Sequence, residues 1–188
     1  MPTMFTHPVI PIAIAAGLGR QQITGRLILL GALFSILPDF DVIAFYFGIP
    51  YSSQWGHRGF THSLLFAAAF SGLSAVILSS WMKTGRTMAF AFLFIAMGSH
   101  GLLDMLTDGG LGIAVFWPFD HARYFFPAQV VKVSPIGMSF FSEWGLQTVM
   151  SELFWIWVPA LLSAAVIFVS IRIYRRILER NQNSQKGC

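Results

Sequence analysis

Charged residues are scarce in this sequence. Asp, Glu, Lys and Arg make up 11% of the 188 residues, hydrophobic residues make up 55%, and the mean hydropathy is +0.66. Because soluble domains carry about 25% charged residues, this composition excludes an ordinary soluble enzyme and indicates a membrane protein. The length fits a single domain and leaves no obvious room for a second one.

Cysteine and several catalytic motifs are also lacking. Cys188 is the one cysteine, so a disulfide within the chain is excluded. HExxH and G-x-S-x-G do not occur, which disfavours a membrane zinc protease and a serine hydrolase. The first residues lack a basic stretch, and Pro8 and Pro11 interrupt the first apolar run, so we expect no cleavable signal peptide.

Long apolar runs account for most of the chain. They predict helices at about residues 8–19, 27–48, 63–82, 87–106 and 153–173. The first run is about 18 Å long as a helix and too short for a hydrocarbon core of about 30 Å, whereas the others are long enough. The predicted fold is therefore all-α: a polytopic membrane helix bundle of four to five transmembrane segments, the first of which is a half-helix candidate.

The basic residues predict an orientation. Nine of the 12 Lys and Arg residues follow the first, third or last apolar run, which places them at one side of the bundle. Because basic residues are enriched in cytoplasmic loops, we expect the C-terminus in the cytoplasm of a cell with this protein in its inner (plasma) membrane. The basic tail then attracts anionic lipid, and nucleic acid is a disfavoured partner because its recognition motifs are missing.

Histidine and aspartate side chains are predicted to share one depth. His7, Asp39 and His100 each lie 13 or 14 residues from the nearest cytoplasmic arginine, which is about 20 Å along a helix. Asp104 and His62 lie nearer the outer end. Ionisable groups at membrane depth are costly and usually pair or bind something, so we expect a site in the outer half of the membrane.

A proline precedes two carboxylates in residues 37–41, LPDFD. On a regular helix Asp39 and Asp41 point about 200° apart, so a break at Pro38 is needed to turn both inward. A helix-capping aspartate is the alternative interpretation. Two carboxylates at membrane depth, without a basic residue nearby in sequence, favour a cation.

Residues 56–63, GHRGFTHS, carry a second group of polar side chains. His57 and His62 are candidate metal ligands, because neutral imidazole commonly binds transition metals. Arg58 offers a forked donor for a phosphate or carboxylate. Thr61 is equally suited to cap the following helix. His57 is the weaker ligand candidate, since histidines are common at membrane interfaces.

Residues 98–110, GSHGLLDMLTDGG, carry the third group. His100, Asp104 and Asp108 recur every four residues, so they stack along one helix face with Thr107 beside them. This spacing suits a chelating pair on a helix. The alternative is a buried ion pair or hydrogen-bond network.

Residues 109–150 are predicted to form a long outer loop rich in aromatic residues. Such rings settle at the membrane interface, and loops of this length are often functional, so the loop is expected to cover the site and receive a lipid-like substrate. We expect His121 at the surface. Glu143 and Glu152 are expected at the rim or as charges near a helix N-terminus.

The three motifs, followed by FWPF, RYFFP and VSPIG, resemble the YdjM family over nearly the whole chain. That family is described as LexA-binding, inner-membrane-associated proteins with a predicted metal-dependent hydrolase activity. The resemblance implies a helical membrane protein with a metal site and phospholipase-like activity. It marks as motif residues His7, Asp39, Asp41, His57, His62, His100 and Asp104, and also Arg58, Thr61, Thr107 and Asp108. The motifs are also similar to parts of the zinc-dependent phospholipase C and P1 nuclease group, whose later His-x-x-x-Glu has no clear match here.

These observations lead to a hypothesis of a metal-dependent hydrolase that acts on phosphoester bonds of a lipid or lipid-linked substrate at the outer face. The predicted ligands are His7, Asp39, Asp41, His57, His62, His100 and Asp104. This donor set favours zinc, with manganese as an alternative, and suffices for one or two ions. Arg58 would bind the phosphate, Asp108 would orient a ligand or move a proton, and Asp41 would complete the site. The alternative is a non-catalytic metal-binding membrane protein or an ion or metal transporter.

The orientation has a direct test. Reporter fusions in the loop at Thr84 and at the C-terminus should both report a cytoplasmic location, because the basic residues cluster there. A C-terminus found outside the cytoplasm would place the histidines and aspartates at the inner face instead.

Overall fold

The protein is all-helical. The computed structural model describes residues 1–135 and 137–186, and within these residues it has no β-strand, only the isolated bridges Thr107–Val131 and Ile113–Tyr124. In chain order the elements are α1 (Val9–Leu18), α2 (Gly25–Ile36), the 3₁₀ segments η1 (Leu37–Phe47) and η2 (Phe60–His62), α3 (Leu64–Met82), α4 (Arg86–Met105), the 3₁₀ segment η3 (Gly137–Phe141), α5 (Glu143–Glu152), the π-helical η4 (Leu153–Trp157) and α6 (Val158–Lys186).

Four helical stretches are long and apolar enough to cross a membrane. They are Gly25–Phe47, Leu64–Met82, Arg86–Met105 and Glu143–Gln182, whereas Val9–Leu18 is shorter. The predicted class, an all-α polytopic membrane helix bundle, is confirmed. Helix α1 has 10 residues, which is about 15 Å of helix, so it reaches only part of the way across the hydrocarbon core.

The last helix is longer than its hydropathy indicated. It begins at Glu143, ten residues before the predicted start at 153, and it continues to Lys186 instead of ending near 173. Polar residues such as Gln147 and Thr148 lower the mean hydropathy of its first turns, so the apolar run begins later than the helix. The basic stretch after Ile171 is rich in residues that favour helix. The loop predicted at 109–150 therefore ends before α5.

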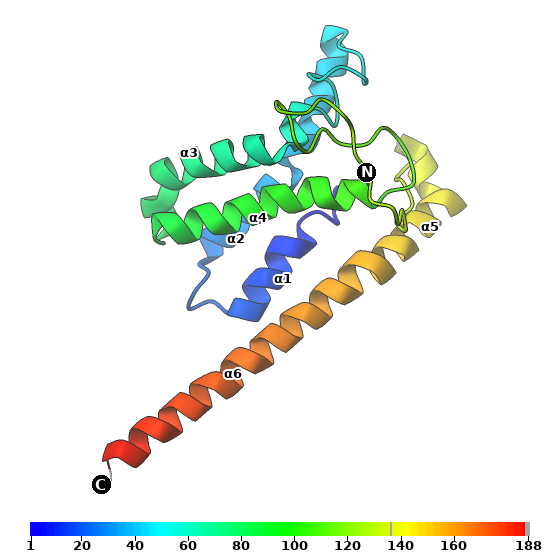
Figure 1. The fold of residues 1–188 in the computed structure, drawn as a ribbon. Coiled ribbons are helices and arrows are strands. Elements are labelled where there is room, and N and C mark those ends of the chain that lie inside the picture. The colour runs from blue at the N-terminus through cyan, green and yellow to red at the C-terminus, as the bar shows by residue number, and fades with distance from the viewer. Residues whose placement is uncertain (136, 187–188) are drawn as a thin grey trace.

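The helices pack as a compact group with one long outlying rod (Figure 1). Helix α3 lies along α4, α2 packs on α4, and α1 packs against both α2 and α6. Helix α6, drawn from orange to red in Figure 1, extends well beyond the other helices at its C-terminal end. The short α1 is thus the main link between α6 and the rest of the bundle.

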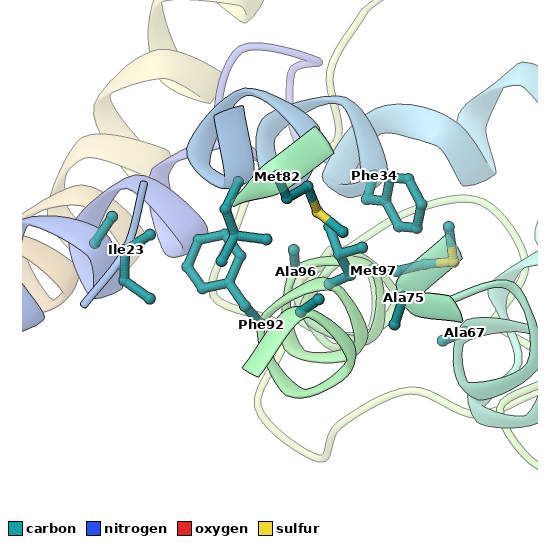
Figure 2. Packing of buried hydrophobic residues seen from close by; sticks show 12 residues of the cluster. Ile23, Phe34, Ala67, Ala75, Met82, Phe92, Ala96 and Met97 are labelled. Carbon is teal, nitrogen blue, oxygen red and sulfur yellow. The ribbon is translucent and has the colours of Figure 1, made fainter. Parts of the chain in front are cut away.

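The core lies between α2, α3 and α4 (Figure 2). Its buried members are Ala15, Ile23, Leu27, Phe34, Ala67, Ala75, Met82, Ala89, Phe92, Leu93, Ala96 and Met97. Several of them are alanines, which allow helix backbones to approach closely, as is usual in membrane bundles. Gly31 on α2 has the same effect, because a Cβ there would overlap the ring of Phe92.

The segment after α4 folds over the ends of the helices that carry the polar motifs. Backbone hydrogen bonds join Ala114 N–H to the Arg58 carbonyl (3.1 Å) and Val131 N–H to the Leu106 carbonyl (3.1 Å). Ile113 of this segment is fully buried against the end of α4. This segment therefore contacts two of the polar motifs, and His121 lies at the surface as expected.

The contact between Gly31 and Phe92 yields a prediction. Gly31→Ala should destabilise the bundle by ~1–3 kcal/mol, because the added methyl group forces the buried Phe92 ring to move. Gly25→Ala is the matched control, since nothing lies within 4 Å of a Cβ at Gly25. The measurement is the thermal unfolding midpoint in detergent. Equal midpoints for the two variants would contradict the packing described here.

Candidate metal centre

Five buried side chains converge beneath the segment that follows α4: His7, Asp39, His62, His100 and Asp104. None of them is more than 6% exposed. The Nε2 atom of His100 lies 3.4 Å from Asp39 Oδ1 and 3.9 Å from Asp104 Oδ2. The Nε2 atom of His62 lies 3.8 Å and 3.6 Å from the same two oxygens. We call these five residues the His/Asp cluster.

The cluster is assembled from four separate segments. His7 directly precedes α1, Asp39 belongs to η1, and His62 ends η2. His100 and Asp104 come from one face of α4, a single turn apart, as their spacing predicts. The structure thus brings together residues that the depth argument placed at a common level of the membrane.

His7 joins the cluster through its ring. The imidazole stacks on that of His100, with ring centroids 3.9 Å apart. Its Nε2 atom lies 3.8 Å from Asp39 Oδ2 and 3.9 Å from Asp104 Oδ1. Neither ring nitrogen has a hydrogen-bond partner among the described residues.

The break at Pro38 has the expected effect on the two carboxylates of LPDFD. Helix α2 gives way to the 3₁₀ segment η1, which has Pro38 in its first turn. The rotation of about 200° between positions i and i+2 of an α-helix leaves their side chains about 160° apart, and with three residues per turn this angle falls to about 120°. Asp39 therefore faces the cluster from one side, while Asp41 faces the histidines of the next segment.

Asp41 organises the turn that carries His57 and His62. It accepts hydrogen bonds from the Thr61 hydroxyl (2.6 Å) and the Arg58 backbone N–H (3.2 Å). Its oxygens also lie 2.6 Å from His57 Nδ1 and 3.2 Å from His62 Nδ1. A carboxylate behind an imidazole fixes ring orientation and tautomer, as is typical of histidines that bind metals. Ser63, rather than Thr61, caps α3.

The outer partners of His62 and His100 determine which ring nitrogens carry hydrogen. His100 Nδ1 lies 2.7 Å from the carbonyl oxygen of Ser35, which can only accept, so this nitrogen is the donor. His62 Nδ1 faces Asp41 and the Thr61 oxygen, whose own hydrogen is given to Asp41. When both imidazoles are neutral, each Nε2 atom then carries a lone pair and no hydrogen. The two Nε2 atoms lie 3.0 Å apart.

With both imidazoles neutral, the centre of the cluster therefore presents lone pairs and carboxylate oxygens, and the Arg58 Nε donor lies beside it, 3.2 Å from Asp104 Oδ2. Within residues 1–135 and 137–186, none of the four carboxylate oxygens of Asp39 and Asp104 meets hydrogen-bond geometry with a donor. Buried polar atoms are normally paired, so this arrangement calls for a positive charge at its centre. Ligands about 2.1 Å from a tetrahedral zinc ion lie roughly 3.4 Å from one another. The ligand atoms of Asp39, His62, His100 and Asp104 lie within 4.8 Å of one another, and the closest pair is 3.0 Å apart, so the group is compact enough to surround one ion.

The pKa values of the histidines outside the spanning helices agree with this interpretation. Burial works against the charged form of His62, but hydrogen bonds with Asp39 and Asp41 raise its pKa to about 9, so without a metal ion the ring carries the extra proton that a bound ion would displace. Burial and the neighbouring His100 lower the pKa of His7 to about 3, which keeps it neutral. The pocket attracts a cation, and it holds His7 in the form that binds metals.

Arg58 is fully buried and faces protein atoms. Its Nη1 donates to the carbonyls of Gly109 (3.0 Å) and Leu111 (2.7 Å), and its Nη2 donates to the Thr107 hydroxyl (3.0 Å). Its Nε lies 3.2 Å from Asp104 Oδ2. The residue has a positive φ of 63°, an unusual conformation that is typical of functional sites. Arg58 thus ties Asp104 to the covering segment.

Asp108 lies outside the cluster. Its Oδ2 accepts from Lys132 Nζ (2.7 Å) and its Oδ1 accepts from the Val133 N–H (2.9 Å). Burial alone would raise the pKa of Asp108, but the hydrogen bonds with Lys132 and Val133 outweigh it and lower that pKa. The structure therefore places the last aspartate of the stripe in the covering segment.

Two partners of the site were not found from the sequence. The Ser35 carbonyl that orients His100 carries no sequence signal, because every residue has such a group. Glu152 was expected at the rim, but it is only 2% exposed and binds the residues before His7. Its position as the one acidic residue between Glu143 and Glu179 in the last helix was a signal that it is buried with a partner.

The fold and the site together define a multi-pass helical membrane protein with a buried histidine–aspartate group that can hold a metal ion. The chain belongs to the YdjM family, because residues 1–176 match the family described as "YdjM inner membrane protein". It is 41% identical over 169 residues to the "Inner membrane protein YbcI" of Escherichia coli (strain K12), a match that covers 89% of this chain and 98% of that protein. No solved structure matches the chain. The family confirms the resemblance and an inner-membrane location.

Removal of single cluster residues tests metal binding. His100→Ala and Asp39→Ala should each lose bound metal from detergent-purified protein, because each deletes a donor from the centre. His121→Ala and Asp108→Asn are the controls and should retain metal, since both residues lie outside the cluster. Full metal content in both cluster variants, measured by elemental analysis, would exclude the site.

Proposed function

We propose that this protein is a metal-dependent hydrolase of phosphoester bonds in a membrane lipid or lipid-linked phosphate. The observation that carries the proposal is the buried group of imidazoles and carboxylates, in which the oxygens of Asp39 and Asp104 have no hydrogen-bond partner among the described residues. A divalent ion held there supplies Lewis-acid polarisation of a phosphoryl oxygen and activation of water. Zinc suits the mixed nitrogen and oxygen donors, and manganese is the alternative.

The cluster residues divide into ligands and supporting residues. We assign His7, Asp39, His62, His100 and Asp104 as the ligands. Asp41 contacts the outer nitrogen of His62 and is assigned to orient it. We assign Arg58 to hold Asp104, and not to bind phosphate, because its donors are engaged with protein atoms.

His57 is the proposed proton carrier. It is 8% exposed, and its Nδ1 is hydrogen-bonded to Asp41, which leaves Nε2 as the acceptor in the neutral ring. In this assignment Nε2 takes a proton from the attacking water and returns it to the oxygen of the leaving group as the phosphorus–oxygen bond breaks. An imidazole held by a carboxylate is the usual form of such a general base.

An apolar groove supports a lipid as the substrate. It has a volume of about 320 Å³ and lies between α1, α4 and the last helix. Its lining residues are Ile10, Ala13, Ile14, Leu103, Trp155, Ile156, Pro159, Ala160, Ser163, Ala164 and Ile167. Ile10 and Leu103 are close in sequence to His7 and Asp104, although no cluster residue lines the groove itself. Its place among membrane-spanning helices suits an acyl or polyprenyl chain.

The basic residues support an outer-facing site. Arg26 and Arg86 begin α2 and α4, while Asp39 and Asp104 lie at the opposite ends of these helical stretches. With the basic ends in the cytoplasm, the cluster and its covering segment face outward. The substrate in this orientation is a lipid of the outer leaflet.

A hydrolysis screen tests the function. Purified protein with added zinc or manganese should release product from phospholipid or polyprenyl-phosphate vesicles. His57→Ala should retain metal but lose about 10²–10⁴-fold in rate, because it removes the proton carrier. His121→Ala is the matched control and should keep full activity.

The same purified protein can distinguish hydrolysis from metal transport. A transporter would move metal across proteoliposome membranes without product formation, whereas a hydrolase turns over substrate without net flux. Metal flux that depends on the cluster, with no hydrolysis in the screen, would replace the proposal by transport. Metal binding with neither flux nor hydrolysis would indicate a structural metal site.

A further inference from the structure

Another buried carboxylate, outside the cluster, contacts the segment that precedes His7. Glu152, at the end of α5, is 2% exposed although it belongs to a membrane-spanning stretch. Its Oε2 accepts hydrogen bonds from the hydroxyls of Thr3 and Thr6, both at 2.6 Å, and its Oε1 accepts from the Thr3 backbone N–H. One carboxylate thus binds the N-terminal segment at three points.

A π-helical turn adds a fourth contact. Trp157 Nε1 donates to the Thr6 hydroxyl oxygen at 2.9 Å. In an α-helix, residues five positions apart point about 140° away from each other. The π-helix Leu153–Trp157 between the two residues has i→i+5 hydrogen bonds, and this wider turn brings Glu152 and Trp157 toward one face. The irregular turn therefore lets both side chains reach Thr6.

Residues 3–6 lead directly to His7. Thr6 N–H donates to the Thr3 carbonyl (2.9 Å), and Val9 N–H donates to the Thr6 carbonyl (3.1 Å). The backbone on both sides of His7 is thereby held in a tight turn. Thr6 is 1% exposed and His7 is 0% exposed, so the turn is buried together with the ring that follows it.

The way His7 is held differs from that of the other two histidines. His62 is oriented by Asp41, and His100 by the Ser35 carbonyl. Neither nitrogen of His7 has a hydrogen-bond partner among the described residues. Because metal-binding histidines normally have such a partner on their outer nitrogen, the position of His7 depends on its backbone and on the stacked ring of His100.

We propose that Glu152 is a positioning residue that sets His7 as a metal ligand by holding the turn of residues 3–6. The inference rests on the proposed metal site and adds a component from the last helix to it. Glu152 is 113 positions from Asp39 and 48 from Asp104 in the sequence, and it contacts no cluster residue itself. Its effect on the metal passes through His7.

The test is a double-mutant cycle read by metal affinity. Glu152→Gln should weaken cobalt or zinc binding by about 10–100-fold, the usual cost of losing an outer partner of a ligand. In a His7→Ala background the same substitution should have no further effect, because the ligand it positions is already gone. Glu143→Gln, the same chemical change at an exposed residue of α5, should leave affinity unchanged.

Two further readouts separate positioning from general stability. The visible spectrum of the cobalt-loaded Glu152→Gln protein should shift toward that of His7→Ala, which a merely structural role would not produce. In the metal-free protein, Glu152→Gln and Thr6→Val should each speed hydrogen exchange in residues 3–9, with Glu143→Gln as the control.

Several results would overturn the inference. These are an additive cycle, an unchanged cobalt spectrum, or a His7→Ala protein that binds metal as tightly as the wild type. The proposed hydrolase activity is tested separately. If the protein shows this coupling but hydrolyses no phosphoester, the positioning role of Glu152 stands and the hydrolase assignment is wrong.

Discussion

Two buried carboxylates without hydrogen-bond donors are the constraint on which the site depends. Asp39 and Asp104 lie within membrane-spanning helices and face each other across three imidazoles. Removing carboxylates from water is costly unless positive charge approaches them. Arg58 supplies part of that charge, at 3.2 Å from Asp104. The other polar atoms face the centre of the cluster, where Asp39, His62, His100 and Asp104 bring ligand atoms within 4.8 Å of one another. A metal ion suits this centre best because it accepts several lone pairs at once.

Irregular backbone is what lets the helices of this bundle build such a site. An unbroken helix offers one polar stripe, as α4 does with His100 and Asp104. The other ligands come from segments where the regular helix is absent: the turn before α1, the 3₁₀ segment η1 and the short η2. Non-helical backbone is tolerated at membrane depth only where protein covers it. The segment after α4 provides that cover, and Arg58 is hydrogen-bonded to it at Gly109 and Leu111.

Membership of the YdjM family places the chain in the inner membrane and agrees with its four membrane-crossing helices. The proposed reaction is inferred from the chemistry of the site residues. The proposed lipid phosphoesterase rests on an imidazole–carboxylate pair near a histidine–aspartate group that could hold a metal ion, and on an apolar groove between the helices. A transporter would need polar groups along a through-path. In α3 the buried polar side chains below His62 are serines, which hold no metal tightly.

The sequence by itself determined the helical class and four to five candidate membrane segments, and it predicted that His7, Asp39 and His100 lie together, because apolar length and helix periodicity act locally. It also indicated that Pro38 would redirect two carboxylates. Only the tertiary structure decided which polar residue plays which part. Asp108 is hydrogen-bonded to Lys132, Arg58 is hydrogen-bonded to the covering segment, and Glu152 is buried against residues 3–6. These outcomes depend on contacts between residues distant in the chain, and on backbone carbonyls such as that of Ser35 that leave no trace in composition or spacing.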